Sequence, residues 1–325
     1  MTNEAPALKV VFMGTPGFAL PSLDAIFRSQ HHIKAVVTAP DKPAGRGRKM
    51  RPSAVKEYAV GKQLPLLQPE KMNDPAFINH LKELAPDVMV VVAFRMIPEV
   101  VWSIPPLGTF NLHASLLPQY RGAAPINHAV MNGETTSGLT TFFIDHKIDT
   151  GNIILQDSIN IAPEETAGEL HDRMMLTGAD LVMETLRLIA LKDVRPIPQD
   201  ELVSAGFPLK TAPRIFPEHT QINWSKSIDT IYNQIRGLSP YPGAVFEMQH
   251  PDEGIKRMKV FRASIDHRPN DVVSPKLVSD HTEGLYVLLP DGILKLLEVQ
   301  LEGRKRMSVD AFLRGFPIDS RWKLL

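Results

Sequence analysis

The run Phe110-Asn-Leu-His-Ala-Ser-Leu-Leu-Pro-Gln-Tyr-Arg-Gly-Ala-Ala-Pro125 is the most informative part of the chain, and Ile148-Asp-Thr-Gly151 follows it later. Asn111 and His113 are separated by one leucine, so both side chains point to one face of a strand end. An amide can donate to a developing oxyanion, an imidazole can move a proton, and a nearby carboxylate can hold the charge of the imidazole. We therefore predict an acyl-transfer site formed by Asn111, His113 and Asp149.

The segments on both sides of this run alternate between strands and helices. Strands are predicted at Lys9–Met13, Ile33–Ala39, Asp87–Ala93 and Thr109–Leu112, and helices at Pro21–Arg28, Ser53–Lys62 and Asp74–Leu84. This order is typical of a doubly wound, Rossmann-like α/β domain. Ligands of such domains lie beyond the carboxyl ends of the strands. His113 lies at one of these ends.

The second half of the chain changes character. Thr166–Leu191 has the periodicity of a long amphipathic helix, and a polar, proline-containing stretch follows it. After one more helix the pattern becomes short strands separated by turns such as Asp291-Gly292, which predicts a small β-barrel. We predict a catalytic domain over residues 1–191, a linker over residues 192–214 and a barrel domain over residues 215–325.

The composition is that of a globular protein. The 325 residues are 43% hydrophobic and 22% charged, and the net charge is zero, so the whole molecule does not indicate nucleic-acid binding. The absence of cysteine excludes disulfides and thiolate catalysis. Glycines and a proline interrupt the apolar stretch Val10–Leu20, which is neither a signal peptide nor a membrane span. We expect a cytoplasmic monomer that does not contact membranes.

The motifs resemble the folate-dependent formyltransferase family, and among its members those that act on tRNA. The resemblance extends from near Lys9 to near Pro317. Besides the Asn/His run, it rests on Gly14-Thr-Pro16, Pro40–Arg48, Val90-Val-Val-Ala93, Ile222-Asn-Trp224, Pro240-Tyr-Pro-Gly243 and Glu302–Met307. It implies an OB-like barrel, and transfer of a formyl group from 10-formyltetrahydrofolate to the amino group of initiator methionyl-tRNA. This chemistry needs no metal, and no His/carboxylate cluster has metal-ligand spacing.

The resemblance also implies where folate binds. The contacting loop corresponds to Ser115, Leu116, Leu117 and Pro118, and Met96 and Ile97 supply further apolar walls. Met and Leu side chains at these positions are equally compatible with a core role. The family commonly has Tyr-Gly where this chain has Phe94-Arg95, which places a bulky cation beside the predicted pocket.

Local basic clusters are the predicted tRNA contacts. The segment Asp41–Arg51 holds five basic residues and two glycines and is predicted to be an exposed loop that follows a phosphate backbone. By resemblance this loop enters the acceptor-stem end of the tRNA. The predicted contacts are Lys42, Arg46, Arg48 and Lys49 in the loop, Lys210 and Arg214 in the linker, and Arg304, Lys305, Arg306 and Arg314 on the barrel. The family's linker often carries a further lysine where this chain has Pro217.

Other functions remain open at this point. A formyltransferase acting on glycinamide ribonucleotide or a sugar nucleotide, or a formyltetrahydrofolate hydrolase, would share the Asn/His/Asp set. A non-catalytic RNA-binding protein could keep the barrel alone. Gly14-Thr-Pro-Gly17 could be read as a dinucleotide loop, but it lacks the G-x-G-x-x-G spacing, and no acidic residue ends the second strand. The basic clusters and the intact catalytic set favour formyl transfer to tRNA.

Overall fold

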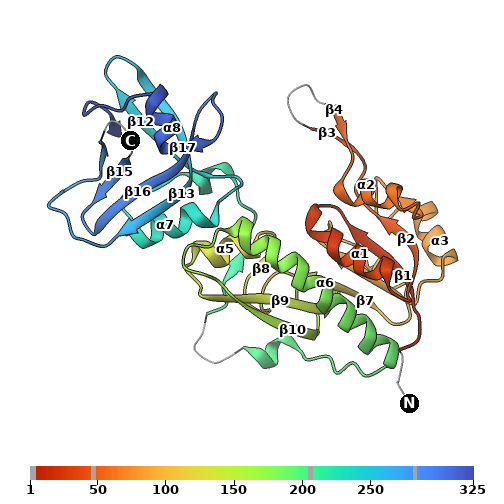
Figure 1. Ribbon diagram of the computed structural model, residues 1–325. Helices are drawn as coiled ribbons and strands as arrows, with labels where there is room; N and C mark the ends of the chain where they lie inside the picture. Colours follow the sequence, from red (N-terminus) through yellow and green to blue (C-terminus); the bar gives the residue numbers. More distant parts are fainter. Residues whose placement is uncertain (1–4, 45–48, 204–207, 281–283) are drawn as a thin grey trace. The chain divides into compact units, whose positions relative to one another are not determined.

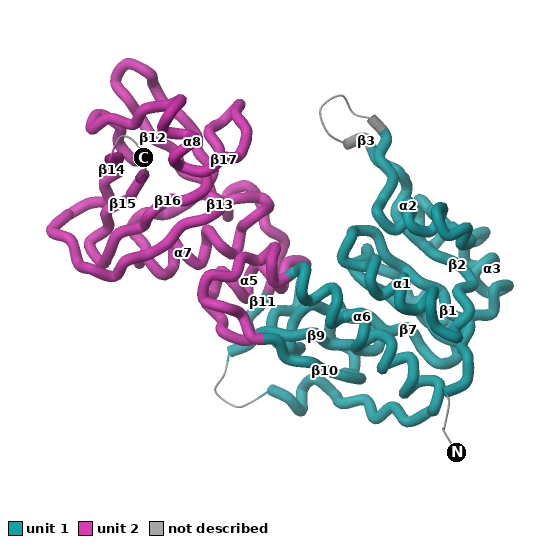
Figure 2. The backbone as a smooth tube through the Cα atoms, in the orientation of Figure 1, with its two compact units in different colours: residues 1–122, 137–159, 171–211 teal, residues 123–136, 160–170, 212–325 magenta. Residues whose placement is uncertain are grey.

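The computed structural model describes residues 5–44, 49–203, 208–280 and 284–325 (Figure 1). The chain divides into two units (Figure 2). Unit 1 comprises residues 1–122, 137–159 and 171–211, and unit 2 comprises residues 123–136, 160–170 and 212–325. Each unit contains its own sheet and its own apolar core.

Unit 1 is built on a seven-stranded sheet. Its strands, in spatial order, are β10 (Ile153–Asn160), β9 (Thr136–Phe143), β7 (Thr109–His113), β6 (Val88–Val92), β1 (Lys9–Gly14), β2 (His32–Val37) and β5 (Leu66–Leu67). The strands from β7 to β5 run parallel, whereas β9 is antiparallel to β7. Every residue of β6 is buried, so this strand, predicted at Asp87–Ala93, is covered on both faces.

Helices cover both faces of this sheet. They are η1 (Gly17–Ala19), α1 (Leu20–Arg28), α2 (Ala54–Gly61), α3 (Pro75–Glu83), α4 (Glu99–Trp102), α6 (Ala167–Leu191) and η2 (Gln199–Leu202). Two of the predicted helices begin with a capping side chain: Ser53 and Asp74 accept backbone N–H groups at the starts of α2 and α3. Phe77 and Leu81 of α3 pack on one face of the sheet. On α6, Thr185 hydrogen-bonds Thr141 of β9 at 2.8 Å.

Two short pairs of strands lie outside this sheet. β3 (Lys42–Ala44) and β4 (Lys49–Arg51) pair antiparallel, with Lys42 opposite Arg51. The segment Asp41–Arg51, predicted as an exposed loop, therefore has a short strand near each end. Strands that pair through backbone hydrogen bonds need no apolar side-chain pattern, so the sequence did not indicate them. β8 (Arg121–Gly122) pairs with β11 (Thr211–Ala212).

Unit 2 is an antiparallel, nearly closed barrel. The strand order is β14 (Lys276–Ser279), β15 (Leu285–Leu289), β16 (Gly292–Leu301), β13 (Gly254–Asp266), β12 (Ala244–His250) and β18 (Lys323–Leu324), and β17 (Met307–Ser308) pairs with β16. The first and last strands of this order also contact each other. The helices are α5 (Pro125–Met131), η3 (Pro217–Thr220), α7 (Ile228–Gly237) and α8 (Val309–Gly315). The small β-barrel that the sequence pattern predicts is confirmed, and it agrees with the OB-like barrel that the resemblance implies.

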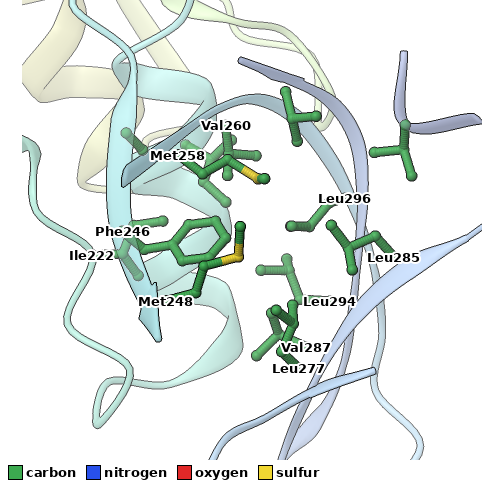
Figure 3. Close-up of a cluster of buried hydrophobic side chains, with 14 of the residues drawn as sticks. Ile222, Phe246, Met248, Met258, Val260, Leu277, Leu285, Val287, Leu294 and Leu296 are labelled. Atoms are coloured by element: carbon green, nitrogen blue, oxygen red, sulfur yellow. The ribbon is translucent and has the colours of Figure 1, made fainter. Parts of the chain in front are cut away.

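The interior of the barrel is apolar because alternate residues of its strands point inward. Ala244, Phe246 and Met248 of β12 are fully buried. Figure 3 shows Phe246, Met248 and Met258 pointing into the same core as Leu294 and Leu296. Among the described helices of both units, none has the length and apolar character that a membrane span requires.

Candidate functional site

The predicted catalytic residues lie at the carboxyl edge of the sheet in unit 1. The last residues of β1 and β6, Gly14 and Val92, are paired, and Val92 is paired with Leu112 of β7. His113 follows Leu112 and ends β7. A Cβ at Gly14 would lie 2.7 Å from Cβ of Ala19, so the close turn after β1 requires glycine. This close approach supports a structural role for the turn.

His113 is buried and both of its ring nitrogens face acceptors. Nε2 donates to the carbonyl oxygen of Tyr120 at 3.0 Å, because a carbonyl can only accept. Nδ1 lies 3.9 Å from Oδ2 of Asp149. The ring meets Phe142 edge-on, at 6.4 Å between centroids. A proton on Nδ1 would therefore face a carboxylate while the other nitrogen keeps its own hydrogen bond.

Asp149 is held in place by the turn between β9 and β10. Its φ is +56°, a left-handed conformation that non-glycine residues adopt rarely. Oδ2 accepts a hydrogen bond from the backbone N–H of Gly122 at 3.0 Å. A Cβ at Gly151 would lie 1.7 Å from the carbonyl oxygen of Phe143, so the turn packs directly on β9. The carboxylate thus reaches His113 from a strained, tightly packed turn.

Asn111 carries an unpaired polar atom. Its Oδ1 is buried, and no described residue forms a hydrogen bond with it. Buried polar atoms of native proteins nearly always have partners, so an unpaired one at this edge indicates a position for a ligand group. Alternation along β7 places this amide on the same face as His113. The structure therefore brings Asn111, His113 and Asp149 together at one edge.

Gln199 is a site residue that the sequence did not reveal. Its side chain is 2% exposed, and Nε2 donates to the carbonyl oxygens of Asp149 at 3.0 Å and Gly151 at 2.9 Å. Its Oε1 accepts from Nε and Nη2 of Arg121 at 3.0 and 2.6 Å. One buried amide therefore joins the Asp149 turn to the residue before Gly122. It lies in the stretch predicted as linker, where a glutamine in a polar sequence gives no signal.

The residues of the predicted folate loop differ in exposure. Ser115 is buried, and its Oγ donates to the carbonyl oxygen of Gln119 at 2.6 Å. Leu117 and Pro118 are also buried, and Leu117 packs with Phe142 in a small apolar cluster. Leu116 is partly exposed. The backbone of this loop is therefore rigidly held, and Leu116 offers the accessible apolar surface.

The other two predicted folate contacts, Met96 and Ile97, also differ in exposure. Ile97 is buried in the core of unit 1, whereas Met96 is 73% exposed. Neighbouring Arg95 donates to the carbonyl oxygens of Pro69 and Glu70, so its guanidinium is fastened to the segment after β5. The bulky cation that distinguishes this chain is thus tied to another loop.

Two of the four tRNA contacts predicted near β3 and β4 belong to the described residues. Lys42 is exposed in β3 and Lys49 belongs to β4, whereas Arg46 and Arg48 lie outside the described residues. Lys56 of α2 donates to Asp41 at 2.7 Å, and this hydrogen bond holds the pKa of the Asp41 carboxyl below its usual range. The Asp41 carboxylate is therefore paired with Lys56 of α2, although Asp41 is next in sequence to Lys42 of β3.

The remaining predicted cations are not equivalent. Lys210 is exposed, and its backbone N–H donates to Gln119 at 2.8 Å. Arg306 forms two hydrogen bonds to Glu298, at 2.7 and 2.5 Å, and Arg314 pairs with Asp310 at 3.0 Å. Arg214, Arg304 and Lys305 are exposed, lie in unit 2 and have no acidic partner within the described residues. Arg214 stacks on Phe216, and Arg304 stacks on Phe316.

A metal centre has no support in the described part of the chain. No group of three or more His, Asp or Glu side chains there could hold an ion. The side-chain groups that the edge presents are an amide, an imidazole and a carboxylate, and the backbone and Gln199 hold the carboxylate.

Comparisons with known proteins place the chain in a family. The formyl transferase family matches residues 8–186, and the formyl transferase C-terminal domain matches residues 214–317. The chain is 46% identical over 317 residues to a methionyl-tRNA formyltransferase of Bacteroides thetaiotaomicron, with 98% of each chain covered. It is 48% identical over 312 residues to the one of Parabacteroides distasonis, with 95% of this chain and 96% of the relative covered.

Solved structures share the fold. An N-formyltransferase from Helicobacter canadensis, solved with folinic acid and dTDP-3-aminofucose, matches with a TM-score of 0.63 at 21% identity, covering 89% of this chain and 99% of that one. A sugar 3N-formyl transferase, solved with dTDP and 5-N-formyl-THF, also gives 0.63, at 20% identity over 92% and 100% of the two chains. Because the sequence relatives are nearly half identical over almost the whole length, the chain belongs to the methionyl-tRNA formyltransferases of the formyl transferase family.

Proposed function

We propose that the enzyme transfers the formyl group of 10-formyltetrahydrofolate to the amino group of methionine carried by initiator tRNA. The name shared by relatives at 46–48% identity supports this acceptor. The observation that carries the chemistry is the buried His113 that faces Asp149, on the same strand face as the Asn111 amide. The unpaired Oδ1 of this amide is an acceptor for an N–H of the substrate, and its Nδ2 is the donor for the oxyanion.

Asn111 and His113 act on the charge that develops during the reaction. The folate supplies the formyl group, and attack by the neutral amine turns the formyl oxygen into an oxyanion. The Asn111 amide donates to that oxygen, and the imidazole donates from Nδ1. Nε2 stays committed to the carbonyl of Tyr120, so Nδ1 is the nitrogen that exchanges protons.

Asp149 stabilises the protonated imidazole and helps to remove the proton of the amine. When the oxyanion collapses, the bond between the formyl carbon and the folate nitrogen breaks, and this proton passes to the nitrogen of the departing tetrahydrofolate. The 3.9 Å between Nδ1 and Oδ2 is too long for a direct hydrogen bond and leaves the proton path to a water or to the amine. Oδ2 already accepts from Gly122, which fixes its direction. Gln199 acts as a positioning residue, because its hydrogen bonds hold the backbone carbonyls of Asp149 and Gly151.

The residues at this edge fit a folate. Hydrogen bonds to Thr140 and Gln156 fix the backbone of Ser115–Pro118, and Leu116 and Met96 offer accessible apolar surface for a pteridine. Leu117 and Ile97 support this surface from the core. These assignments make the partly exposed side chains the contacts and the buried ones their support.

The tRNA is bound by cations of both units. We propose Lys42, Arg46, Arg48, Lys49, Lys210, Arg214, Arg304 and Lys305 as phosphate contacts, with smaller contributions from Arg306 and Arg314. The last two already pair with Glu298 and Asp310, so a phosphate would have to compete with a carboxylate. Arg214, Arg304 and Lys305, which have no acidic partner within the described residues, gain more from a phosphate because they give up only water.

The function is tested by supplying 10-formyltetrahydrofolate with initiator methionyl-tRNA, elongator methionyl-tRNA or a dTDP-amino sugar. We expect formyl-methionine to form rapidly on the initiator tRNA, more slowly on the elongator tRNA and no formyl sugar. Formylation of the sugar alone would assign the enzyme to the small-molecule branch of the fold. Hydrolysis of the folate without transfer to any acceptor would also contradict the proposal.

A further inference from the structure

Unit 2 contains a groove that none of the roles above uses. It has a volume of about 690 Å³ and is lined by residues of α5, η3, the turn before β12, β12, β13 and the end of β16. Its distinctive side chains are two aromatic rings, Phe216 and Tyr241, and two cations, Arg257 and Lys259. Glu302 is the acidic residue among those that line it.

The rings are unusually exposed for their size. Tyr241 is 82% exposed and Phe216 is 45% exposed, whereas aromatic residues of the barrel core such as Phe246 and Phe312 are buried. Tyr241 lies in a built turn: Gly243 donates to the carbonyl oxygen of Leu238 at 2.8 Å, and Gly243 has a φ of +86°. Exposed apolar rings that share a concave surface indicate a binding site.

The cations of the groove are available to a ligand. Arg257 and Lys259 are two residues apart on β13, so both point to the same side of the sheet. Lys259 Nζ donates to the carbonyl oxygen of Pro242 at 2.8 Å, which leaves its charge beside the Tyr241 turn. Neither cation has an acidic partner within the described residues. Arg214 adds a further charge, 5.6 Å from the centre of the Phe216 ring.

We propose that this groove binds one unpaired nucleotide of the RNA substrate, with its base stacked on Tyr241 and Phe216 and its phosphate against Arg257 and Lys259. Aromatic rings beside cations are the usual platform for single-stranded nucleic acid, since every base has a flat face. An acidic peptide would use the cations and leave the rings without a planar partner. The inference rests on the proposed tRNA substrate and adds a base contact to the phosphate contacts.

Binding of deacylated tRNA, measured without folate, tests the groove. Tyr241→Ala combined with Phe216→Ala should raise Kd by about tenfold or more, and Tyr241→Phe should bind like the wild type. Tyr286→Ala is the matched control, because Tyr286 lines a different cavity of the same barrel, of about 470 Å³. Unchanged binding by the double variant overturns the proposal, and so does equal weakening by the control. Thermal unfolding of each variant verifies that the barrel is intact.

A fluorescence reporter distinguishes stacking from charge. In Tyr241→Trp, tRNA should quench the added indole emission relative to the wild type, whereas heparin, a polyanion without bases, should compete for binding without quenching. Bound tRNA that leaves this emission unchanged overturns the proposal. Formylation by the wild type is scored separately. Normal formylation with an unaffected double variant rejects the groove alone, whereas base-dependent quenching without any formylation rejects the proposed function alone.

Discussion

The catalytic edge of unit 1 and the groove of unit 2 differ in how far their side chains are buried and paired within the protein. At the edge, His113 is 6% exposed, and the carbonyl oxygen of Tyr120 already accepts a hydrogen bond from its Nε2 before any substrate arrives. In the groove, Tyr241 is 82% exposed and Arg257 has no acidic partner among the described residues. The edge is preorganised for chemistry, whereas the exposed rings and the cations of the groove are available to bind a substrate. Substitutions in the first should lower kcat, and those in the second should raise KM.

The largest effects are expected at the edge itself. Asn111→Ala and His113→Ala should each lower kcat by about 10²–10³ while the protein stays folded, because each removes a donor to the oxyanion. Steady-state kinetics with methionyl-tRNA measures the decrease, and circular dichroism with thermal unfolding checks the fold. A well-folded His113→Ala enzyme with near-normal kcat would remove the imidazole from the mechanism.

Gln199 should give the next largest effect. Gln199→Glu keeps the acceptor for Arg121 but replaces the N–H donors that hold the carbonyls of Asp149 and Gly151. We expect kcat to fall by roughly ten- to a hundredfold with little change in KM for tRNA, because a misplaced catalytic group costs up to about 10²-fold. The pH profile of kcat should shift as well, since the carboxylate that faces His113 moves. A loss of stability with unchanged kcat and pH profile would mean that Gln199 is only structural.

Much of the fold could be predicted from local patterns, and the exceptions have physical causes. The all-valine-and-methionine strand β6 and the Ser53 and Asp74 caps depend on neighbouring residues, so the sequence reveals them. The antiparallel strand β9 mixes threonine and phenylalanine without clear alternation and was not predicted.

The candidate site shows the same limit. Asn111 and His113 share a strand, so their common face follows from alternation. Gln199 acts through contacts about fifty residues distant in sequence, at Asp149 and Gly151, which no local pattern encodes. The ion pair of Arg306 with Glu298 depends on the tertiary fold, and that of Arg314 with Asp310 depends on helix geometry. The basic residues alone therefore do not show which cations are paired.

Salt dependence should separate the paired cations from the unpaired ones. Replacing Arg304 and Lys305 by serine should reduce the slope of log Kd against log salt by up to about two units, one for each phosphate that the variant no longer binds. The matched double variant at Arg306 and Arg314 also removes two cations but should change the slope less, because Glu298 and Asp310 already neutralise them. Equal slopes for the two variants would show that these ion pairs do not limit phosphate binding.

The smallest effect concerns the stability of unit 1. Burial lowers the pKa of His31, whose Nδ1 accepts a hydrogen bond from the backbone of Leu8 at 3.1 Å. The folded state favours the neutral ring, so stability falls as the pH drops below the unfolded pKa of about 6.5, by at most about 1.4 kcal/mol per unit until the folded pKa is reached. Chemical denaturation at pH 7.5 and 5.5 should show this decrease, and His31→Gln should show less of it. An equal decrease in the variant would assign the effect to other groups.

Single-turnover formylation at saturating methionyl-tRNA tests the division between the two regions most directly. The wild type, His113→Ala and Tyr241→Ala are each mixed with 10-formyltetrahydrofolate, and formyl-methionine is followed with time. We predict that Tyr241→Ala reaches the wild-type rate once tRNA saturates it, whereas His113→Ala remains about a hundredfold slower at every tRNA concentration. Recovery of the wild-type rate by His113→Ala at high tRNA would contradict a catalytic edge in unit 1.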